Sequence, residues 1–238
     1  MRTAIALLGS LAAVPAYPAT FANINGVPVE FPAGAISFAD KVVEFTPGLN
    51  LNAGTGQIEP LPAYRRAANV LGPPDMDITR SVSCFSSPND QACGFVSLGV
   101  GGVLTVKFTD NLLSGSGTSA PDLWLFDMGT PDAFFIDIST DGNIWLNVGT
   151  VTTVPGVDID AFGHGVGDTF AWVRLRDAPG GQPNGPTVGA DIDAIGAIST
   201  TVVPLPAPGL LLATALAGLA VRRHFSPGDE ARVPAGAR

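Results

Sequence analysis

Aspartates separated by a single residue recur in this chain and are the side chains best suited to chemistry. Asp191 and Asp193 flank Ile192 in an apolar segment. Successive side chains of a strand point to opposite faces, so both carboxylates are expected on one face, about 7 Å apart. Calcium binds such carboxylates together with loop carbonyl oxygens. The pattern predicts a structural calcium; the alternative is an acidic strand face that is solvated or paired with Arg174 and Arg176.

Two further aspartates are expected to approach the same site from the N-terminal side of the fold. Asp75 and Asp77 lie beside a Pro-Pro turn, and the predicted metal ligands are therefore Asp75, Asp77, Asp191 and Asp193. Asp158 and Asp160 repeat the same spacing. The spacing is not that of an EF-hand loop, so the sequence favours no stronger assignment.

Catalytic signatures are missing from the sequence. It contains no nucleophile elbow, phosphate-binding loop, zinc-protease motif or dinucleotide fingerprint. A Ser-His-Asp triad would have to combine His164 with Ser114 or Ser116, in glycine-rich loops that position catalytic groups poorly. We therefore expect no catalytic residues and no enzyme, with a hydrolase as the least favoured interpretation.

Three tryptophans could offer flat faces to a sugar, because carbohydrate sites combine aromatic rings with planar polar groups. Trp124, Trp145 and Trp172 all fall within expected strands. We therefore expect them in the core. A glycan site would then lie in the loops around residues 110–122 or 180–187.

The two cysteines, Cys84 and Cys93, are close in sequence and the chain has no others. In an exported chain this spacing predicts a disulfide that closes a surface loop and contributes roughly 2 to 3 kcal/mol of stability. A metal site would need more thiols or histidines than this sequence has.

The elements that must position these residues are predicted to be short strands. Apolar and polar residues alternate over residues 103–109. Segments 133–139 and 144–148 flank a turn with Asp141-Gly142, where glycine allows the positive φ of a tight hairpin. No segment before Pro208 shows a sustained helical period. The other expected strands are residues 27–31, 36–45, 95–98, 122–127, 169–176 and 191–198. We expect an all-β fold, an antiparallel jelly-roll-like β-sandwich, with an N-terminal signal helix and a short C-terminal hydrophobic helix.

Composition agrees with a β-rich globular body. The chain has 238 residues, of which 46% are hydrophobic and 14% charged, so a solvating disordered chain is excluded. Its 29 glycines and 21 prolines favour many short strands. A net charge of −9 would repel phosphates, so nucleic acid is not an expected partner.

The N-terminus has the features of a secretory signal. Arg2 precedes an apolar run over residues 4–14, and small residues follow. Cleavage is expected after Ala16 or Ala22. A buried N-terminal helix is the alternative.

The C-terminus combines a proline-bearing motif, an apolar run and an arginine pair. A helix can begin only near Pro208 and would reach Val221. Its length, about 21 Å, is short of the roughly 30 Å of a bilayer core. The arginines would stay on the cytoplasmic side.

This C-terminal segment resembles the PEP-CTERM class of sorting signals, in the variant with a VPLPA motif. The residues that carry the resemblance are Val203, Pro204, Leu205, Pro206, Ala207, Arg222 and Arg223. The resemblance implies an exosortase-type transpeptidase as partner, contact with the membrane through the C-terminal helix before processing, export through the inner membrane, and display or release at the surface of a Gram-negative bacterium. A plain tail anchor is the alternative. The expected domains are a signal peptide (1–22), a β-sandwich (23–202), the sorting signal (203–224) and a cytoplasmic tail (225–238).

The body resembles a galactose-binding-like, discoidin-related jelly roll of bacterial surface proteins. The matching stretches are ANVLGPPD at 68–75, VSLGVGG at 96–102, DLWLFD at 122–127, ISTDG at 138–142 and GADIDAI at 189–195. The resemblance implies a non-enzymatic module, whose relatives often bind glycans and hold a structural calcium. We therefore expect a structural or adhesive surface protein. The alternative is a carbohydrate-binding module for extracellular polysaccharide.

Overall fold

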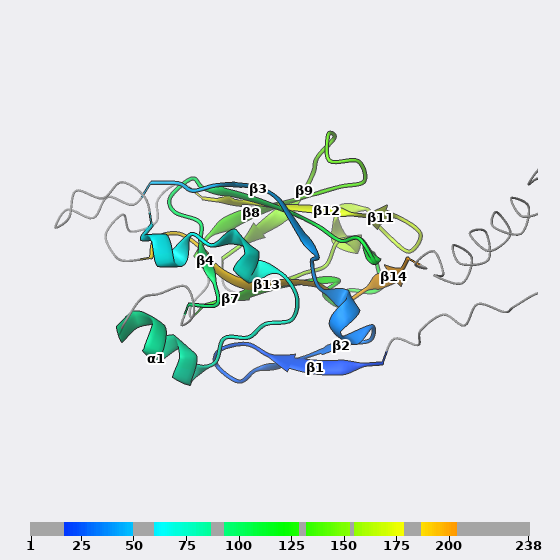
Figure 1. The fold of residues 1–238 in the computed structure, drawn as a ribbon. Coiled ribbons are helices and arrows are strands. Elements are labelled where there is room, and N and C mark those ends of the chain that lie inside the picture. Colours follow the sequence, from blue (N-terminus) through cyan, green and yellow to red (C-terminus); the bar gives the residue numbers. More distant parts are fainter. Residues whose placement is uncertain are drawn as a thin grey trace, which may run out of the picture. The chain divides into compact units, whose positions relative to one another are not determined.

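The computed structural model describes residues 17–49, 60–86, 93–128, 132–152, 155–178 and 187–203. They belong to one compact unit, Val14–Val203, built from antiparallel sheets (Figure 1). The strands are β1 (Ala19–Ala22), β2 (Pro28–Phe31), β3 (Lys41–Thr46), β4 (Val96–Ser97), β5 (Val103–Lys107), β6 (Asn111–Ser114), β7 (Leu123–Asp127), β8 (Phe134–Ser139), β9 (Leu146–Val151), β10 (Gly156–Val157), β11 (Thr169–Phe170), β12 (Trp172–Asp177), β13 (Asp191–Ala197) and β14 (Thr200–Val202). The helices are α1 (Ile78–Ser86) and the short 3₁₀ turns η1 (Gly34–Ser37), η2 (Pro62–Tyr64), η3 (Ala67–Val70) and η4 (Asp160–Phe162).

Two sheets enclose the main core. A five-stranded sheet has the order β3-β5-β12-β8-β9, and a four-stranded sheet has the order β10-β7-β13-β4. One continuous buried cluster contains side chains of both, including Leu104, Val173 and Ile136 from the first and Leu125 and Ile192 from the second. A three-stranded sheet, β11-β6-β14, and the β1-β2 hairpin complete the fold. The expected antiparallel all-β fold is confirmed.

Strand β12 shows how side-chain alternation builds the sandwich. Val173 and Leu175 are fully buried, whereas Trp172, Arg174 and Arg176 are half-buried on the other face. Because neighbouring side chains of a strand face opposite ways, one strand supplies both core and surface.

Strand β13 is buried along its whole length, so it cannot follow this pattern. Its second face packs under the N-terminal hairpin, where Phe31 and Phe38 contact Phe126 and Ala194. A side chain at Gly196 would meet the Phe31 ring at 2.6 Å. Glycine therefore lets the hairpin approach the strand closely.

Helix α1 is a correction to the expectation that the body of the chain, residues 23–202, has no helical segment. Its N-terminus is capped by Asp77, whose Oδ1 accepts the Arg80 N–H at 2.8 Å. The helix was missed because it has only nine residues, although Ile78, Val82 and Phe85 recur at the helical spacing i, i+4 and i+7. In the structure this apolar stripe is exposed, whereas Ser81 and Cys84 are buried.

The hairpin expected around Asp141-Gly142 is confirmed by the antiparallel pairing of β8 with β9 and by the positive φ of Gly142. The strand expected over residues 36–45 is shorter than predicted, because η1 occupies its start. The predicted signal segment up to residue 16 and the sorting signal from residue 204 onward lie outside the described residues. Among the described residues, no helix is long and apolar enough to cross a membrane.

Candidate functional site

Three aspartates meet where β7 begins and β10 ends. In the antiparallel pairing of these strands Val157 lies opposite Leu123, and the Asp122 N–H donates to the Val157 carbonyl at 2.8 Å. The register therefore places Asp122 beside Asp158. The chain then enters η4, whose first residue is Asp160.

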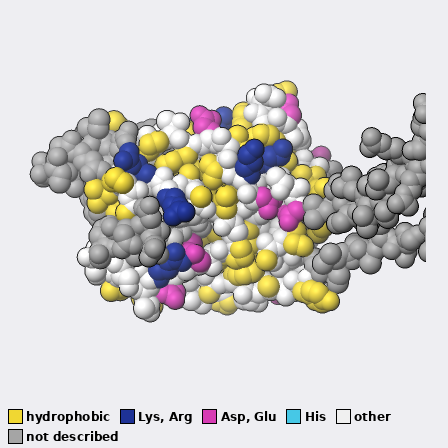
Figure 2. Space-filling model, viewed as in Figure 1, with side chains coloured by type: hydrophobic (Ala, Val, Ile, Leu, Met, Phe, Trp, Pro, Cys, Tyr) yellow, Lys and Arg dark blue, Asp and Glu magenta, His cyan; other side chains and the backbone are white. Residues whose placement is uncertain are grey.

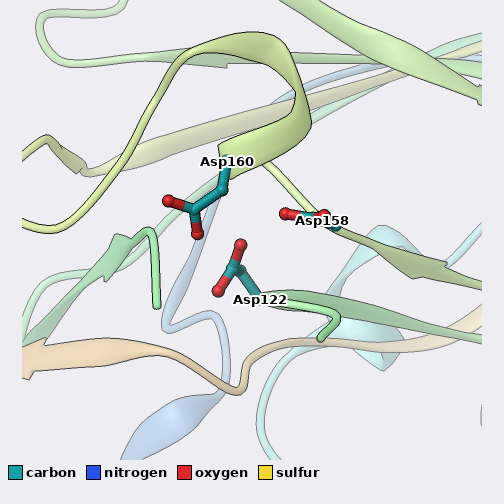
Figure 3. Close-up of side chains that lie close together, drawn as sticks. All are labelled: Asp122, Asp158 and Asp160. Carbon is teal, nitrogen blue, oxygen red and sulfur yellow. The ribbon is translucent and has the colours of Figure 1, made fainter. Parts of the chain in front are cut away.

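The three carboxylates converge on a common space (Figure 3). One oxygen of each lies within 4.8 Å of an oxygen of each of the other two. Asp122 is fully buried, while Asp158 and Asp160 are half-buried. Among the described residues no ion pair is recorded for any of them, so no side-chain cation offsets their mutual repulsion.

Backbone N–H groups hold one oxygen of each carboxylate. Asp122 Oδ2 accepts from Ile159 N at 3.0 Å, and Asp158 Oδ1 accepts from Ala161 N at 3.3 Å. Asp160 Oδ2 accepts from the backbone N–H groups of Ser116 and Gly117, both at 2.9 Å. The side chains are thus oriented by the loops that carry them.

The second oxygen of Asp122 has no partner. Asp122 Oδ1 is buried and receives no hydrogen bond. Leaving a buried acceptor unpaired costs about 1 to 3 kcal/mol, and more for a charged group. Such an atom needs an explanation, and a bound ion is one of the usual ones.

A second acidic group lies deeper, at the other end of β7. Burial, with a smaller contribution from repulsion by Asp132, raises the pKa of Asp191 to about 7 and that of Asp177 to about 6. Burial also raises the pKa of Asp127 well above its usual range, with a further contribution from Asp191. Tyr64 Oη, Asp127 Oδ2 and Asp191 Oδ1 are buried without a hydrogen-bond partner.

The four predicted calcium ligands are distributed over two places. Asp193 accepts the backbone N–H groups of Asp75 at 3.3 Å and Met76 at 3.2 Å, so the structure brings Asp75 and Asp193 together. Asp75 also pairs with Arg80, and Asp77 caps α1.

The pairing of β13 with β7 shifts register between Ile192 and Ala194, which places a β-bulge at Asp193. Burial and then repulsion from Asp75 raise the pKa of Asp193 to about 7. The charged neighbours that raise the pKa of Asp191 are instead Asp132 and Asp177. Calcium at these four residues remains a prediction.

The predicted disulfide is present. The sulfurs of Cys84 and Cys93 are bonded, and the two Cα atoms lie 4.9 Å apart. The bond ties the end of α1 to the segment that leads into β4. Both cysteines are fully buried in a small cluster with Tyr64 and Phe95.

The outer face of the five-stranded sheet carries rings paired with cations. Lys107 Nζ lies 4.7 Å from the centroid of the Trp172 ring. The Arg174 guanidinium lies 4.1 Å from the Trp145 ring centroid. All three tryptophans are half-buried. Trp145 and Trp172 lie on this outer face, so the expectation that they are core residues is wrong, whereas Trp124 packs against a buried cluster in the other sheet. Trp172 alternates with the buried Val173 along β12, and Trp145 lies directly before β9.

A buried carboxylate organises the same face. Asp137 pairs with Arg174 at 2.9 Å and with Arg176 at 2.7 Å. Burial would raise the pKa of Asp137, but hydrogen bonds from Arg176, Asn147 and Arg174 lower it overall. The rings and guanidinium groups are therefore held in place by a hydrogen-bonded network.

His164 and the loop serines do not form a recorded catalytic arrangement within the described chain. The Ser116 hydroxyl contacts Thr118 and Asp160. The His164 ring packs edge-on against Phe170, with ring centroids 5.3 Å apart.

Asp122 is the site residue that sequence reasoning missed. The spacing of Asp158 and Asp160 is visible in the sequence, and Asp122 follows a proline at the start of an expected strand. Only the pairing of β7 with β10 brings the three together.

Comparison with known proteins adds little. No family model matches the chain, and no curated protein matches it. A solved chain described as "Glycoside hydrolase" is similar over 66% of this chain, with 11% sequence identity and a TM-score of 0.32. This chain spans 31% of that structure's length. A likeness this distant carries no argument about function.

Proposed function

We propose that this chain is an exported, non-catalytic β-sandwich protein with a structural or adhesive role at the cell surface or in the extracellular matrix. The observation that carries the proposal is the Cys84–Cys93 disulfide. Structural disulfides persist in oxidising compartments and are rare in the cytosol. The disulfide supports the interpretation of the N-terminal segment as a secretory signal.

The N-terminal hairpin favours one of the two cleavage positions. β1 pairs with β2 along its whole length, and the Phe21 ring lies 4.9 Å from the Phe38 ring centroid. Cleavage after Ala22 would remove this strand and expose the apolar cluster it covers. We therefore propose that export ends with cleavage after Ala16.

At the other end, the VPLPA-type motif and the arginine pair support sorting by an exosortase-type transpeptidase. The proposal is that the enzyme cleaves near Val203–Ala207 and removes the apolar segment with Arg222 and Arg223. The body remains as a domain displayed at the surface or released.

The experiment is intact-mass measurement of the protein from separated cell fractions. We expect an outer or secreted form whose mass lacks residues 1–16 and the segment after the motif. A mature form that keeps Arg222 and Arg223 contradicts sorting and indicates a tail anchor. A full-length cytoplasmic chain contradicts export.

A second candidate function is binding of an extracellular polysaccharide, and the outer face of the five-stranded sheet favours it. Trp145 and Trp172 are half-buried there beside Lys107, Arg174 and Arg176. The protein as a whole is acidic, with a net charge of −9. On the face that Figure 2 displays, basic and acidic side chains are both scattered among hydrophobic ones. Rings beside fixed cations would suit a sugar chain that carries carboxylates.

The test is affinity electrophoresis in gels that contain an acidic or a neutral bacterial polysaccharide. We expect retardation by the acidic polymer, reduced by Trp172→Ala and by Trp145→Ala. Trp124→Ala is the matched control, because Trp124 lies in the other sheet beside Gly156. Equal mobility in both gels would contradict polysaccharide binding, and the structural or adhesive role would remain as the proposed function.

A further inference from the structure

We propose that Asp122, Asp158 and Asp160 form a calcium site that joins the loop after β6 to the start of β7 and to η4. The site lies apart from the four aspartates that the sequence analysis assigned to calcium. The inference goes beyond the proposed function, because it assigns a ligand and a group of residues to one end of the sandwich.

The separation of the oxygens fits calcium. Carboxylate oxygens that lie within 4.8 Å of one another are close enough for one ion to bind them at calcium–oxygen distances of about 2.3 to 2.6 Å after small side-chain shifts. Magnesium bonds are about 2.1 Å long and demand a near-ideal octahedron. Calcium, in contrast, accepts flexible sets of carboxylate ligands, and water can complete the shell because Asp158 and Asp160 are half-buried.

The unpaired oxygen of Asp122 is the second observation that points to an ion. Asp122 is fully buried, its Oδ1 has no hydrogen-bond partner, and its carboxylate is turned toward the other two (Figure 3). A cation in this space would pair that oxygen and offset the repulsion among three carboxylates. Backbone donors alone satisfy only one oxygen of each aspartate.

The loops are already arranged to present the ligands. Asp160 Oδ2 holds the N–H groups of Ser116 and Gly117. A side chain at Gly115 would collide with the His164 carbonyl, so the two loops are closely packed. Calcium on Asp160 would therefore fix the loop after β6 as well as η4.

The experiment is calorimetric titration and thermal unfolding of the full-length chain with calcium chloride, after treatment with excess chelator. We expect a dissociation constant of about 10⁻⁴ to 10⁻³ M, as in extracellular modules. At ten times that concentration the melting temperature should rise by about 3 to 6 °C. Asp122→Asn and Asp158→Asn should each weaken binding at least about tenfold.

Two controls make the outcome specific. Asp168→Asn changes an exposed carboxylate that accepts the Gly165 N–H in the same region and should bind calcium like the parent. Asp193→Asn tests the other predicted site and should leave this one intact. Asp158 is half-buried, so Asp158→Asn tests the site even if the variant at the fully buried Asp122 fails to fold.

Amide hydrogen exchange gives an independent readout. Calcium should slow exchange at the amides of Ser116 and Gly117 in the parent and not in Asp158→Asn. The proposal is overturned if calcium neither binds nor protects these amides, or if only Asp193→Asn removes binding.

Discussion

At the scale of single residues, the described carboxylates divide by what surrounds them. Asp137 is buried but receives arginine hydrogen bonds, and its pKa is lowered. Asp177, Asp191 and Asp193 are buried with weaker compensation, and burial raises the pKa of each. The same side chain is therefore stabilised as an anion in one place and disfavoured in the other.

The raised pKa values predict that stability falls as pH rises. Asp191 and Asp193 have a pKa of about 7 and Asp177 of about 6, against an ordinary value of 3.8. Between these limits the folded chain holds more protons than the unfolded chain, so the free energy of unfolding decreases with pH. In excess chelator we expect the melting temperature to drop by at least about 3 °C from about pH 5 to about pH 8.

Asp191→Asn should flatten this dependence and raise stability at the higher pH. Asp137 does not contribute to the change in melting temperature between about pH 5 and about pH 8. Its pKa is lowered, so the stability that it provides is lost only below about pH 4. A melting temperature that is equal at both pH values, or higher at pH 8, would contradict the assignment.

At the scale of elements, α1 depends on its covalent tie. The helix has nine residues and exposes Ile78, Val82 and Phe85, so little apolar packing supports it. The disulfide from Cys84 and the cap from Asp77 hold it instead.

Cys84→Ser should therefore lower the free energy of unfolding by about 2 to 3 kcal/mol and leave the fold intact. Urea denaturation measures the loss, and the far-UV circular dichroism spectrum of the folded protein reports retention of the sheets. Joined Cys84 and Cys93 peptides in a non-reducing digest confirm the bond. Two free thiols in freshly exported protein would refute it.

Neighbouring glycines before β5 should respond differently to the same change. A side chain at Gly102 would fall on the Leu98 carbonyl, so backbone must move, and Gly102→Ala should cost more than about 3 kcal/mol. Gly101 has open space around it but a φ of +74°, so Gly101→Ala should cost about 1 to 2 kcal/mol. Urea denaturation compares the two. Equal losses in the free energy of unfolding would mean that the backbone around Gly102 moves at little energetic cost.

The sequence predicts the strands that have one solvent-exposed face and one buried face. Strand β12 alternates regularly between half-buried and buried residues, so period-two reasoning finds it. β13 is covered on both faces, and its bulge at Asp193 breaks the alternation on which the calcium prediction rests. Asp122 joins Asp158 only through long-range strand pairing, which no local pattern reveals.

At the scale of the whole molecule, the chain combines an all-β body with two expected export signals. The body has a disulfide and antiparallel sheets, while most of both signals lies outside the described residues. The proposed export and sorting of the protein therefore depend on short segments at its two ends. Substitutions in these segments can test export and sorting without changing the folded body.

Changing the motif should separate sorting from folding. In the double variant Pro204→Ala/Pro206→Ala the proposed recognition sequence is lost, whereas the described strands end at Val202. Removing the two prolines also lets a helix extend toward the body, since proline blocks helix interiors. We expect the variant to stay with the inner membrane and to keep Arg222 and Arg223 by intact mass.

The matched control is Pro227→Ala, C-terminal to the arginine pair, which should be processed like the parent protein. Both variants should show the parent melting temperature for the body, because neither change falls within the described sheets. If the double variant is cleaved and released like the parent, the prolines are not what the transpeptidase recognises. The resemblance at the C-terminus would then carry no function, and export would rest on the N-terminal segment and the disulfide alone.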